Sequence, residues 1–206
     1  MPKSKKRHEV CRHKDRGHYD EQTIHQILDQ GKICHVGITV DAQPFVIPMA
    51  YVRQGRSLIL HGAPKSRLLN QLAKGVPVCV TVTHLDGLVL ARSTFHHSLN
   101  FRSVVAFGTA RPIEDLAEKH AALAALTEHL APGRTQVARA ATDQEAQATS
   151  VVLFEIDDAS AKIRNGPPID SPQDMMLDVW AGVIPVSVLE GEPVPAPDLK
   201  AGLVYR

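Results

Sequence analysis

The sequence predicts a mainly β domain with flanking helices, in which antiparallel strands form a closed or split β-barrel. Runs of alternating apolar and β-branched residues are frequent enough for about six to eight short strands. Few segments carry the apolar spacing of a helix. No G-x-G-x-x-G motif follows a strand, which disfavours the parallel sheets that bind dinucleotides. Together these three observations favour a barrel over a layered α/β fold.

The composition is that of an ordinary soluble globular protein. The chain has 206 residues, of which 44% are hydrophobic and 22% charged, enough for one substantial core. We expect a flexible basic N-terminal arm at residues 1–11, one domain at residues 12–190 and a C-terminal tail at residues 191–206. The net charge of +1 indicates neither a nucleic-acid nor a membrane surface. No long apolar run follows the basic head, so we expect no signal peptide or membrane span and a cytoplasmic location.

Neither the cysteines nor the histidines indicate a metal site. Cys11, Cys34 and Cys79 are odd in number, widely spaced and form no C-x-x-C pair, so reduced thiols are expected. His96 and His97 are adjacent and would face opposite sides of a strand. No third ligand lies near them, so no metal is predicted.

The first third of the chain predicts one helix followed by three strands. The helix is expected over residues 21–30, with Asp20 as its N-cap. Alternating, β-branched runs at residues 32–40 and from Phe45 onward predict a hairpin. A third strand is expected at residues 57–61.

Pro48 falls in the middle of the second strand of this hairpin. Proline has no backbone N–H, so in a central strand it removes a ladder hydrogen bond. We therefore expect Pro48 either at a bulge, which can re-aim side chains next to a site, or beside an unpaired edge.

The rest of the chain alternates strands and turns around one long helix. Strands are expected at residues 76–85, 102–112 and 150–156, turns at residues 86–87 and 157–160, and an amphipathic helix at residues 114–130. A polar stretch at residues 134–148 has room for one short helix. The proline-rich tail is expected to wrap the domain irregularly.

The segment from Ile59 to Leu68 is the strongest candidate for an anion site. A strand ends at Gly62, and Ser66 precedes the first apolar residues of a short helix. The free N–H groups and the dipole of a helix start attract a phosphate, and Lys65 and Arg67 add positive charge. The alternative is that Ser66 only caps the helix and the two cations are solvated.

His61, Arg102 and Trp180 are further candidates. An imidazole at the strand end before the anion turn could titrate, donate a hydrogen bond or ligate a metal or haem, although a structural role is the alternative. The Arg102 guanidinium suits a phosphate or a carboxylate, or a surface ion pair. Trp180 most simply fills the core, but could stack on a flat ring across an interface. No nucleophile motif is present, so any catalysis would depend on a bound cofactor.

Several motifs, taken in order, resemble the pyridoxamine 5′-phosphate oxidase-like flavoproteins and, within them, the nitroimidazole-resistance, flavin-nucleotide-binding branch. The motifs are R-H-K-D-R-G-H-Y-D, I-C-H-V-G-I, F-V-I-P-M, L-H-G-A-P-K-S-R, D-G-L-V-L-A-R-S-T-F-H-H-S-L-N-F-R-S-V-V-A-F-G and D-V-W-A-G-V-I-P, between about Arg12 and Pro185. The resemblance implies an FMN-binding split barrel that forms a homodimer with two flavins at the subunit interface. The residue pattern that vitamin B6 oxidases use for their substrate is not recognisable, so that reaction is not expected.

The resemblance also implies which residues meet the cofactor. Contacts to the flavin ring are expected from Ile47, Pro48 and Met49. The ring edge and phosphate are expected to lie near His61, Gly62, Ala63, Lys65, Ser66 and Arg67. The partner subunit is expected to contribute Ser98, Arg102 and Trp180. His61 is the expected catalytic residue.

Two functions are compatible with this resemblance. The first is an FMN-dependent oxidoreductase that passes electrons from a reduced nicotinamide nucleotide to a small electrophile, such as a nitro compound or a quinone. The second is a non-catalytic flavin- or haem-binding carrier or sensor, in which His61 or His97 ligates iron. A deazaflavin is a third cofactor to consider. In each case the expected partners are a second copy of the chain and small molecules, without nucleic acid or membrane.

Overall fold

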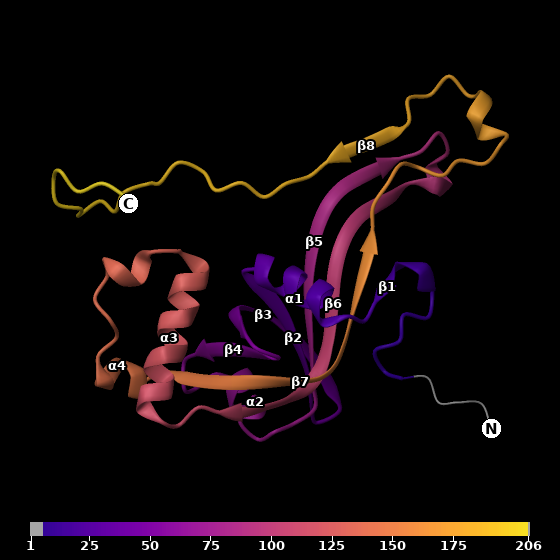
Figure 1. The fold of residues 1–206 in the computed structure, drawn as a ribbon. Helices are drawn as coiled ribbons and strands as arrows, with labels where there is room; N and C mark the ends of the chain where they lie inside the picture. The colour runs from indigo at the N-terminus through magenta and orange to yellow at the C-terminus, as the bar shows by residue number, and fades with distance from the viewer. Residues whose placement is uncertain (1–5, 206) are drawn as a thin grey trace, which may run out of the picture.

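The structure, a computed structural model, describes residues 6–205. Its body is an antiparallel β-barrel with flanking helices (Figure 1). Two long strands extend out of the barrel and, with a short third strand, form an arm, which the C-terminal tail follows. The strands are β1 (Gly17–His18), β2 (Ile33–Val40), β3 (Gln43–Gln54), β4 (Ser57–Gly62), β5 (Val78–Leu90), β6 (Ser98–Pro112), β7 (Ser150–Arg164) and β8 (Gly182–Pro185). The α-helices are α1 (Glu21–Gln30), α2 (Arg67–Leu72), α3 (Leu116–Leu130) and α4 (Asp143–Gln147). The predicted mainly β fold is confirmed.

The barrel closes because β7 pairs with both β4 and β6. The ring runs β7-β4-β3-β2-β5-β6 and returns to β7, and every pair is antiparallel. β3 pairs with β2 along the whole of β2, but with β4 only from Tyr51↔Leu60 to Gln54↔Ser57. The first part of β3, residues 43–50, therefore has a neighbour on one side only. The barrel is split there.

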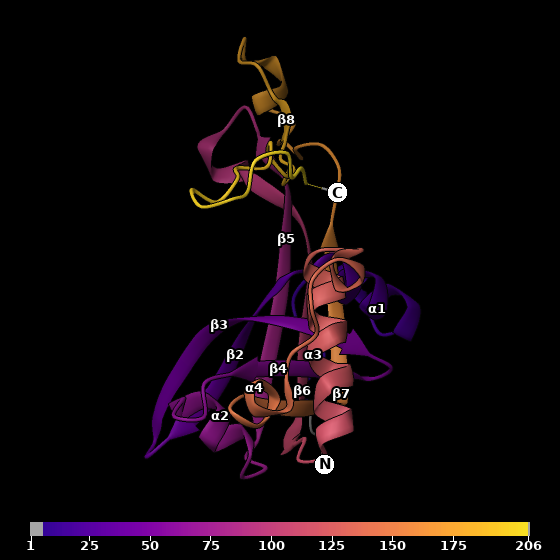
Figure 2. The same ribbon diagram turned by 90° about the vertical axis from the view of Figure 1, so that its left-hand side faces the viewer.

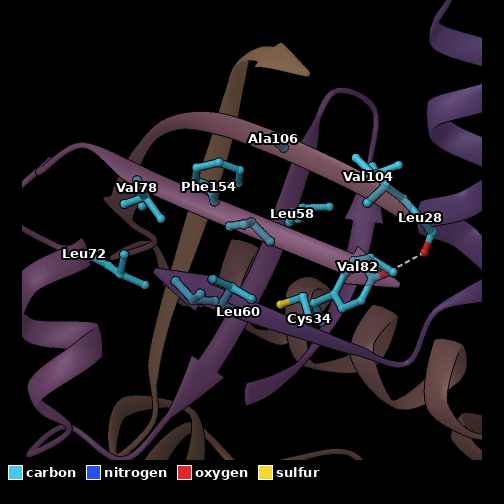
Figure 3. Close-up of a cluster of buried hydrophobic side chains, with 14 of the residues drawn as sticks. Leu28, Cys34, Leu58, Leu60, Leu72, Val78, Val82, Val104, Ala106 and Phe154 are labelled. Atoms are coloured by element: carbon cyan, nitrogen blue, oxygen red, sulfur yellow. Dashed lines mark hydrogen bonds between the residues drawn. The ribbon is translucent and has the colours of Figure 1, made fainter. Parts of the chain in front are cut away.

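Aliphatic side chains fill the inside of the barrel (Figure 3). Leu58 and Leu60 of β4 are fully buried and pack in one cluster with Phe154 of β7. The buried hydroxyl of Tyr51 donates a hydrogen bond to the carbonyl of Leu28 at the end of α1. This bond ties α1 to the barrel wall.

The helices cover the barrel where their apolar faces require it. α1 and α2 both place three buried aliphatic side chains in the main cluster. Asp20 caps α1 as predicted, since its carboxylate accepts the N–H of Thr23 at 2.8 Å. α3 forms a second cluster on the outer side of β4, with Ala122 and Leu126 packed against Ile59. The short helix allowed within residues 134–148 is α4.

The predicted turn at Asp86-Gly87 is wrong. β5 continues through this dipeptide to Leu90, and only the pairing register with β6 shifts, between Leu85 and Gly87. The chain reverses after Leu90 instead, through a 3₁₀ turn at Thr94–His96. β5 and β6 therefore leave the barrel together and form the base of the arm (Figures 1 and 2). The same happens at residues 157–160, where β7 continues through the predicted turn with a register shift against β6.

The tail does not wrap the domain as expected. β8 pairs with β5 from Gly87↔Pro185 to Leu90↔Gly182, and the chain then runs away from the arm without regular structure (Figure 1). Trp180, just before β8, is 65% exposed, so the interpretation that it fills the core is wrong.

The N-terminal segment contacts the barrel. Residues 1–5 of the expected arm lie outside the described residues. Arg7 forms ion pairs with Asp157 (3.0 Å) and Asp158 (2.9 Å) of β7, and its guanidinium lies over the ring of Phe107, 5.3 Å from the centroid. Within residues 6–205, no helix is both long and apolar enough to cross a membrane.

Candidate functional site

The anion turn, residues 62–67, connects β4 to α2 as predicted. The N–H of Ser66 donates to the carbonyl of Ala63 at 2.9 Å, which closes the turn. Ser66 is also the N-cap of α2, because its hydroxyl accepts the N–H of Leu69 at 3.4 Å. The capping role predicted for Ser66 is therefore present in the structure. Its two neighbours, Lys65 and Arg67, are exposed.

Lys65 and Arg67 carry the positive charge of the turn. Both side chains are exposed, and among residues 6–205 neither lies within ion-pair distance of a carboxylate. The Arg67 guanidinium lies over the ring of Phe45, 5.0 Å from its centroid, which orients it toward the start of β3. The turn therefore presents two uncompensated cations beside the split.

The split places the predicted ring contacts opposite the turn. Ile47, Pro48 and Met49 lie in the part of β3 that has no neighbour on the β4 side. Ile47 and Met49 pack against the main cluster, whereas Pro48 is exposed. Pro48 pairs with His35 without a bulge, so the unpaired-edge alternative holds and the bulge alternative is wrong. A flat ligand at this edge would meet backbone and the Pro48 ring.

His61 lies where β4 separates from β3. The last β3–β4 pair on this side is Tyr51↔Leu60, and His61 follows it, still paired with Val151 of β7. Its Nδ1 atom is buried and has no hydrogen-bond partner among the described residues. Burial lowers the pKa of His61 below its usual 6.5, so the imidazole is neutral at pH 7. A neutral imidazole can donate from one nitrogen and accept or ligate with the other.

The residues expected from a partner subunit do not join this group within one chain. Ser98 pairs with Val89 in the arm, and Trp180 comes two residues before Gly182, which pairs with Leu90 at the end of β5. Figure 1 shows β8 on the arm, away from α2. Arg102 lies at the base of the arm and forms a bidentate ion pair with Asp86. Its Nη2 and Nε donate to the two carboxylate oxygens at 2.8 and 3.0 Å. The third contact of its guanidinium is the side-chain oxygen of Gln30. Its donors are therefore engaged inside the chain.

Two cavities among the described residues are each too small for a flavin. One, of about 190 Å³, lies between the N-terminal segment, α1 and β7, and includes His8, His25 and Asp158. The other, of about 120 Å³, lies beside α2 and includes Asn70 and Lys119. Pockets for organic ligands usually enclose roughly 300–1,000 Å³. A flavin at the split would thus need cover from another surface.

The remaining histidines give no metal cluster. Within residues 6–205, no three His, Cys, Asp or Glu side chains are placed to hold a metal ion. His97 lies in the arm, with Nδ1 2.9 Å from the carbonyl of Ser93.

His35 is a residue near the split that the sequence reasoning did not single out. It is exposed in β2 and is paired with Pro48, and the alternation in I-C-H-V-G-I could have placed it on the outer face.

The comparisons with known proteins agree on one family. A model of the family described as pyridoxamine 5′-phosphate oxidase matches residues 20–163. No curated protein matches the chain. Among solved structures, the flavocytochrome Anf3 from Azotobacter vinelandii is 36% identical with a TM-score of 0.91, over 98% of this chain and 94% of that one.

Two further structures extend the comparison. The FAD and haem binding protein from Mycobacterium smegmatis is 36% identical with a TM-score of 0.89, over 93% of this chain and 94% of that one. A candidate 5-nitroimidazole antibiotic resistance protein from Bacteroides thetaiotaomicron is 27% identical with a TM-score of 0.59, over 71% of this chain and 87% of that one. The similarity to the Anf3 structure covers 98% of this chain and therefore includes the arm and most of the tail.

Proposed function

Because the chain belongs to the pyridoxamine 5′-phosphate oxidase family, we propose that it binds a flavin nucleotide at the split and acts as an oxidoreductase. Electrons pass from a reduced nicotinamide nucleotide to a small electrophile such as a nitro compound or a quinone. The observation that carries this proposal is the pair of uncompensated cations, Lys65 and Arg67, beside the free edge of β3.

The residues at the split fit the parts of a flavin nucleotide. The anion turn offers Lys65, Ser66 and Arg67 to a phosphate, and charge-assisted hydrogen bonds of this kind are about twice as strong as neutral ones. Pro48 and the backbone edge of β3 offer an apolar face to the isoalloxazine ring. FMN needs only this phosphate site, whereas FAD needs further room for its adenosine. The names of two relatives include FAD or flavocytochrome, so the extracted cofactor must be identified rather than assumed.

A bound flavin would supply hydride and single-electron transfer through its ring, and the protein would hold and orient it. The role proposed for His61 is to present a neutral imidazole next to the reacting ring. Nδ1 has no hydrogen-bond partner among residues 6–205 and is buried in the single chain, so a contact between it and a substrate or the flavin edge requires the imidazole to turn about its side-chain bonds. The low pKa suits a group that must stay uncharged at pH 7.

We also propose that the working unit is a homodimer with two interfacial flavins. Ser98 and Trp180 lie on the arm, far from the anion turn of their own chain, and the cavities of about 190 and 120 Å³ among the described residues are too small for a flavin. A second copy brings an arm to the split and covers the ligand. Arg102 serves this arrangement by holding the base of the arm through Asp86.

A flavin titration tests the proposal. The purified full-length protein should be yellow, or should become so with FMN or FAD, and chromatography of the released chromophore identifies which. Replacing both cations (Lys65→Gln with Arg67→Gln) should weaken flavin binding at least about 100-fold, because hydrogen bonds to charged groups contribute roughly 1.5–3 kcal/mol each when well ordered, and about 1.4 kcal/mol corresponds to tenfold in affinity. The matched control, Lys74→Gln with Arg134→Gln, removes the same charge from exposed positions elsewhere and should bind as the wild type does. Equal affinity in both double variants would contradict the phosphate site.

Turnover is tested separately from binding. Anaerobic addition of NADH or NADPH to the flavin-loaded protein should bleach the flavin absorbance, and a nitro compound or quinone should restore it. His61→Ala should slow one of these steps without releasing the flavin. Failure of both nicotinamides to reduce the flavin would remove the oxidoreductase proposal and leave flavin binding. The same titration is repeated with a deazaflavin in place of FMN.

The second candidate function is electron transfer by a protein that carries haem as well as flavin. It is favoured by the partnerless, neutral His61, and by two relatives whose names include haem or flavocytochrome. A Soret band on haem addition would support it. If His61 is the iron ligand, His61→Ala loses the band and His97→Ala keeps it; the reverse result assigns His97, and no band in the wild type excludes this function.

A further inference from the structure

The chain exposes far more surface than a compact protein of its mass. Its solvent-accessible surface is 13663 Å² for 22.5 kDa. A compact monomer of this mass exposes about 9,500 Å², so about 4,000 Å² is in excess. Obligate homodimers bury roughly 2,000–5,000 Å² or more over both subunits, which is about 1,000–2,500 Å² or more per subunit. The excess of one chain is therefore more than enough for a large permanent interface.

Much of this excess belongs to the C-terminal tail, residues 186–205. Seven apolar side chains of the tail are exposed: Val188 (96%), Leu189 (84%), Val194 (91%), Leu199 (45%), Leu203 (59%), Val204 (73%) and Tyr205 (67%). Surface apolar residues that occur singly are ordinary, but a contiguous apolar patch marks an interaction site. A segment of this length with its apolar side chains uncovered is expected to be covered by a partner.

The tail is held to its own chain only at its beginning. The N–H of Val186 donates to the carbonyl of Asp86 at 3.1 Å, and Glu190 forms an ion pair with Lys32. Beyond Glu190, the hydrogen bonds found within residues 6–205 are local turns, such as Leu199 N–H to the carbonyl of Ala196. From residue 191 onward, no hydrogen bond or ion pair among residues 6–205 ties the tail to the rest of its own chain.

The sequence of the tail makes it a stiff, extended segment. Prolines at positions 193, 195 and 197 fix φ near the polyproline value. At about 3.1 Å per residue, the extended part, residues 186–195, reaches about 30 Å, and two turns follow it, at residues 196–199 and 200–203. Because the prolines restrict the free chain, the tail loses less conformational entropy when it binds.

The occupant that fits is a second copy of this chain. The tail and its neighbouring charges give no reason to expect nucleic acid or an anionic membrane, since residues 186–205 contain three carboxylates (Glu190, Glu192, Asp198) and one lysine (Lys200). Under the proposed function, Trp180 lies on the partner's flavin site. Between Trp180 and the tail, β8 pairs with β5 of the same chain, so the tail leaves from its own arm, next to the surface that would cover the partner's flavin site.

We propose that residues 186–205 form an exchanged strap, in which the tail of each subunit lies across the barrel of the other and holds the dimer together. This inference rests on the interfacial flavin site of the proposed function. The strap supplies apolar contact that neither barrel supplies by itself, and it makes the dimer depend on residues far from the flavin.

Truncation tests the strap. A chain that ends at Val186 keeps β8 and the whole barrel, so far-UV circular dichroism should be that of an intact barrel. In analytical ultracentrifugation, its dimer dissociation constant should rise at least 100-fold over the full chain. An unchanged dissociation constant would overturn the strap.

Point variants separate a specific contact from a general effect of truncation. Val188→Ser with Leu189→Ser should weaken the dimer at least tenfold. Val137→Ser, at a 59% exposed valine outside the arm and tail, is the control and should leave the dimer unchanged. If both variants behave like the wild type, the strap is not the contact.

Crosslinking shows which copy the tail touches. A photoreactive phenylalanine analogue in place of Leu189 should give a product of twice the chain mass under ultraviolet light, in mixtures that carry two different tags. A product of single-chain mass only would overturn the strap. If dimers form through the tail but no flavin binds, the proposed function fails and the strap stands. If flavin binds to a dimer that survives truncation, the strap fails and the proposed function stands.

Discussion

At the scale of single residues, two side chains with buried polar atoms affect the stability of the fold. His61 has a buried Nδ1 without a partner, and Tyr51 has a buried hydroxyl with one. A buried polar atom without a partner costs free energy, so His61 Nδ1, which has no partner among residues 6–205, lowers the stability of the fold. Burial raises the pKa of Tyr51, which keeps the hydroxyl protonated as a donor.

His61 makes stability depend on pH. Its folded pKa is lowered by burial, so the folded chain resists protonation that the unfolded chain accepts near pH 6.5. The stability contribution is therefore complete above pH 6.5 and is lost as the pH falls toward the folded pKa. We expect the wild type to lose stability faster than His61→Leu between pH 7 and pH 5, by up to about 1.4 kcal/mol per pH unit. Urea unfolding at several pH values measures this, and parallel profiles would contradict it.

Tyr51→Phe tests the bond that ties α1 to the barrel. The change removes the hydroxyl and leaves the ring in its site, so the loss reports the hydrogen bond to Leu28. The carbonyl of Leu28 also accepts the N–H of Gly31 at 3.3 Å and is not left without a donor. We therefore expect a loss of about 1 kcal/mol by urea unfolding. A loss above about 3 kcal/mol would show that the hydroxyl does more than make this bond.

At the scale of elements, the strands are longer than the local signals indicate. Asp-Gly at residues 86–87 and D-D-A-S at residues 157–160 are typical of turns, yet β5 and β7 continue through both. In each case the pairing register shifts, because the residues that favour turns also favour the bulges that bend a strand. After a turn the chain pairs back on the strand it has just left, whereas after a bulge it continues along the same neighbour. Which of the two occurs depends on the tertiary structure.

Gly108 lies at the register shift between β6 and β7 and has no room for a side chain. A Cβ atom there would lie 1.8 Å from the carbonyl oxygen of Glu155, a backbone atom that cannot rotate away. Gly108→Ala must push the two strands apart, and we expect a loss of about 3 kcal/mol or more by thermal or urea unfolding. Gly191→Ala is the control, since a Cβ at Gly191 meets nothing within 4 Å and should change stability by less than about 0.5 kcal/mol. Similar losses in both variants would be inconsistent with the close approach.

At the scale of the whole molecule, the barrel has the contacts needed for stability within one chain, whereas the arm does not. The barrel closes its own hydrogen-bond ring and fills its interior with two apolar clusters. The arm is a three-stranded extension of β5, β6 and β8 with exposed apolar side chains, among them Phe95 (86%) and Met176 (86%). A buried clasp between Arg92 and Asp170 (2.9 Å) joins the two sides of the arm.

Hydrogen exchange should separate these two parts. Amides of β4 and of the barrel half of β6 should exchange most slowly at every protein concentration, because they open only on global unfolding. Amides of β8 should exchange slowly in concentrated samples and faster on dilution, because the proposed dimer, in which a second copy covers the arm, dissociates by mass action. Protection of β8 that does not change with concentration would mean that the arm is stable in the single chain.

The sequence by itself determined the barrel class, the family, the capped helices and the anion turn. These depend on period, caps and turn residues, which act over a few neighbouring positions. It also placed Lys65, Ser66 and Arg67 correctly in one turn. The assignment of the site residues to one flavin stays a prediction.

Only the tertiary structure decided which side of β3 is unpaired, that β5 and β7 pass through their turn signals, and that Trp180 is exposed on an arm. Each depends on which strand lies opposite, and a local pattern carries no information about that. The same holds for the tail. Its prolines predict an irregular segment, but whether it wraps its own barrel depends on which apolar surface is left uncovered, and its own chain covers little of it.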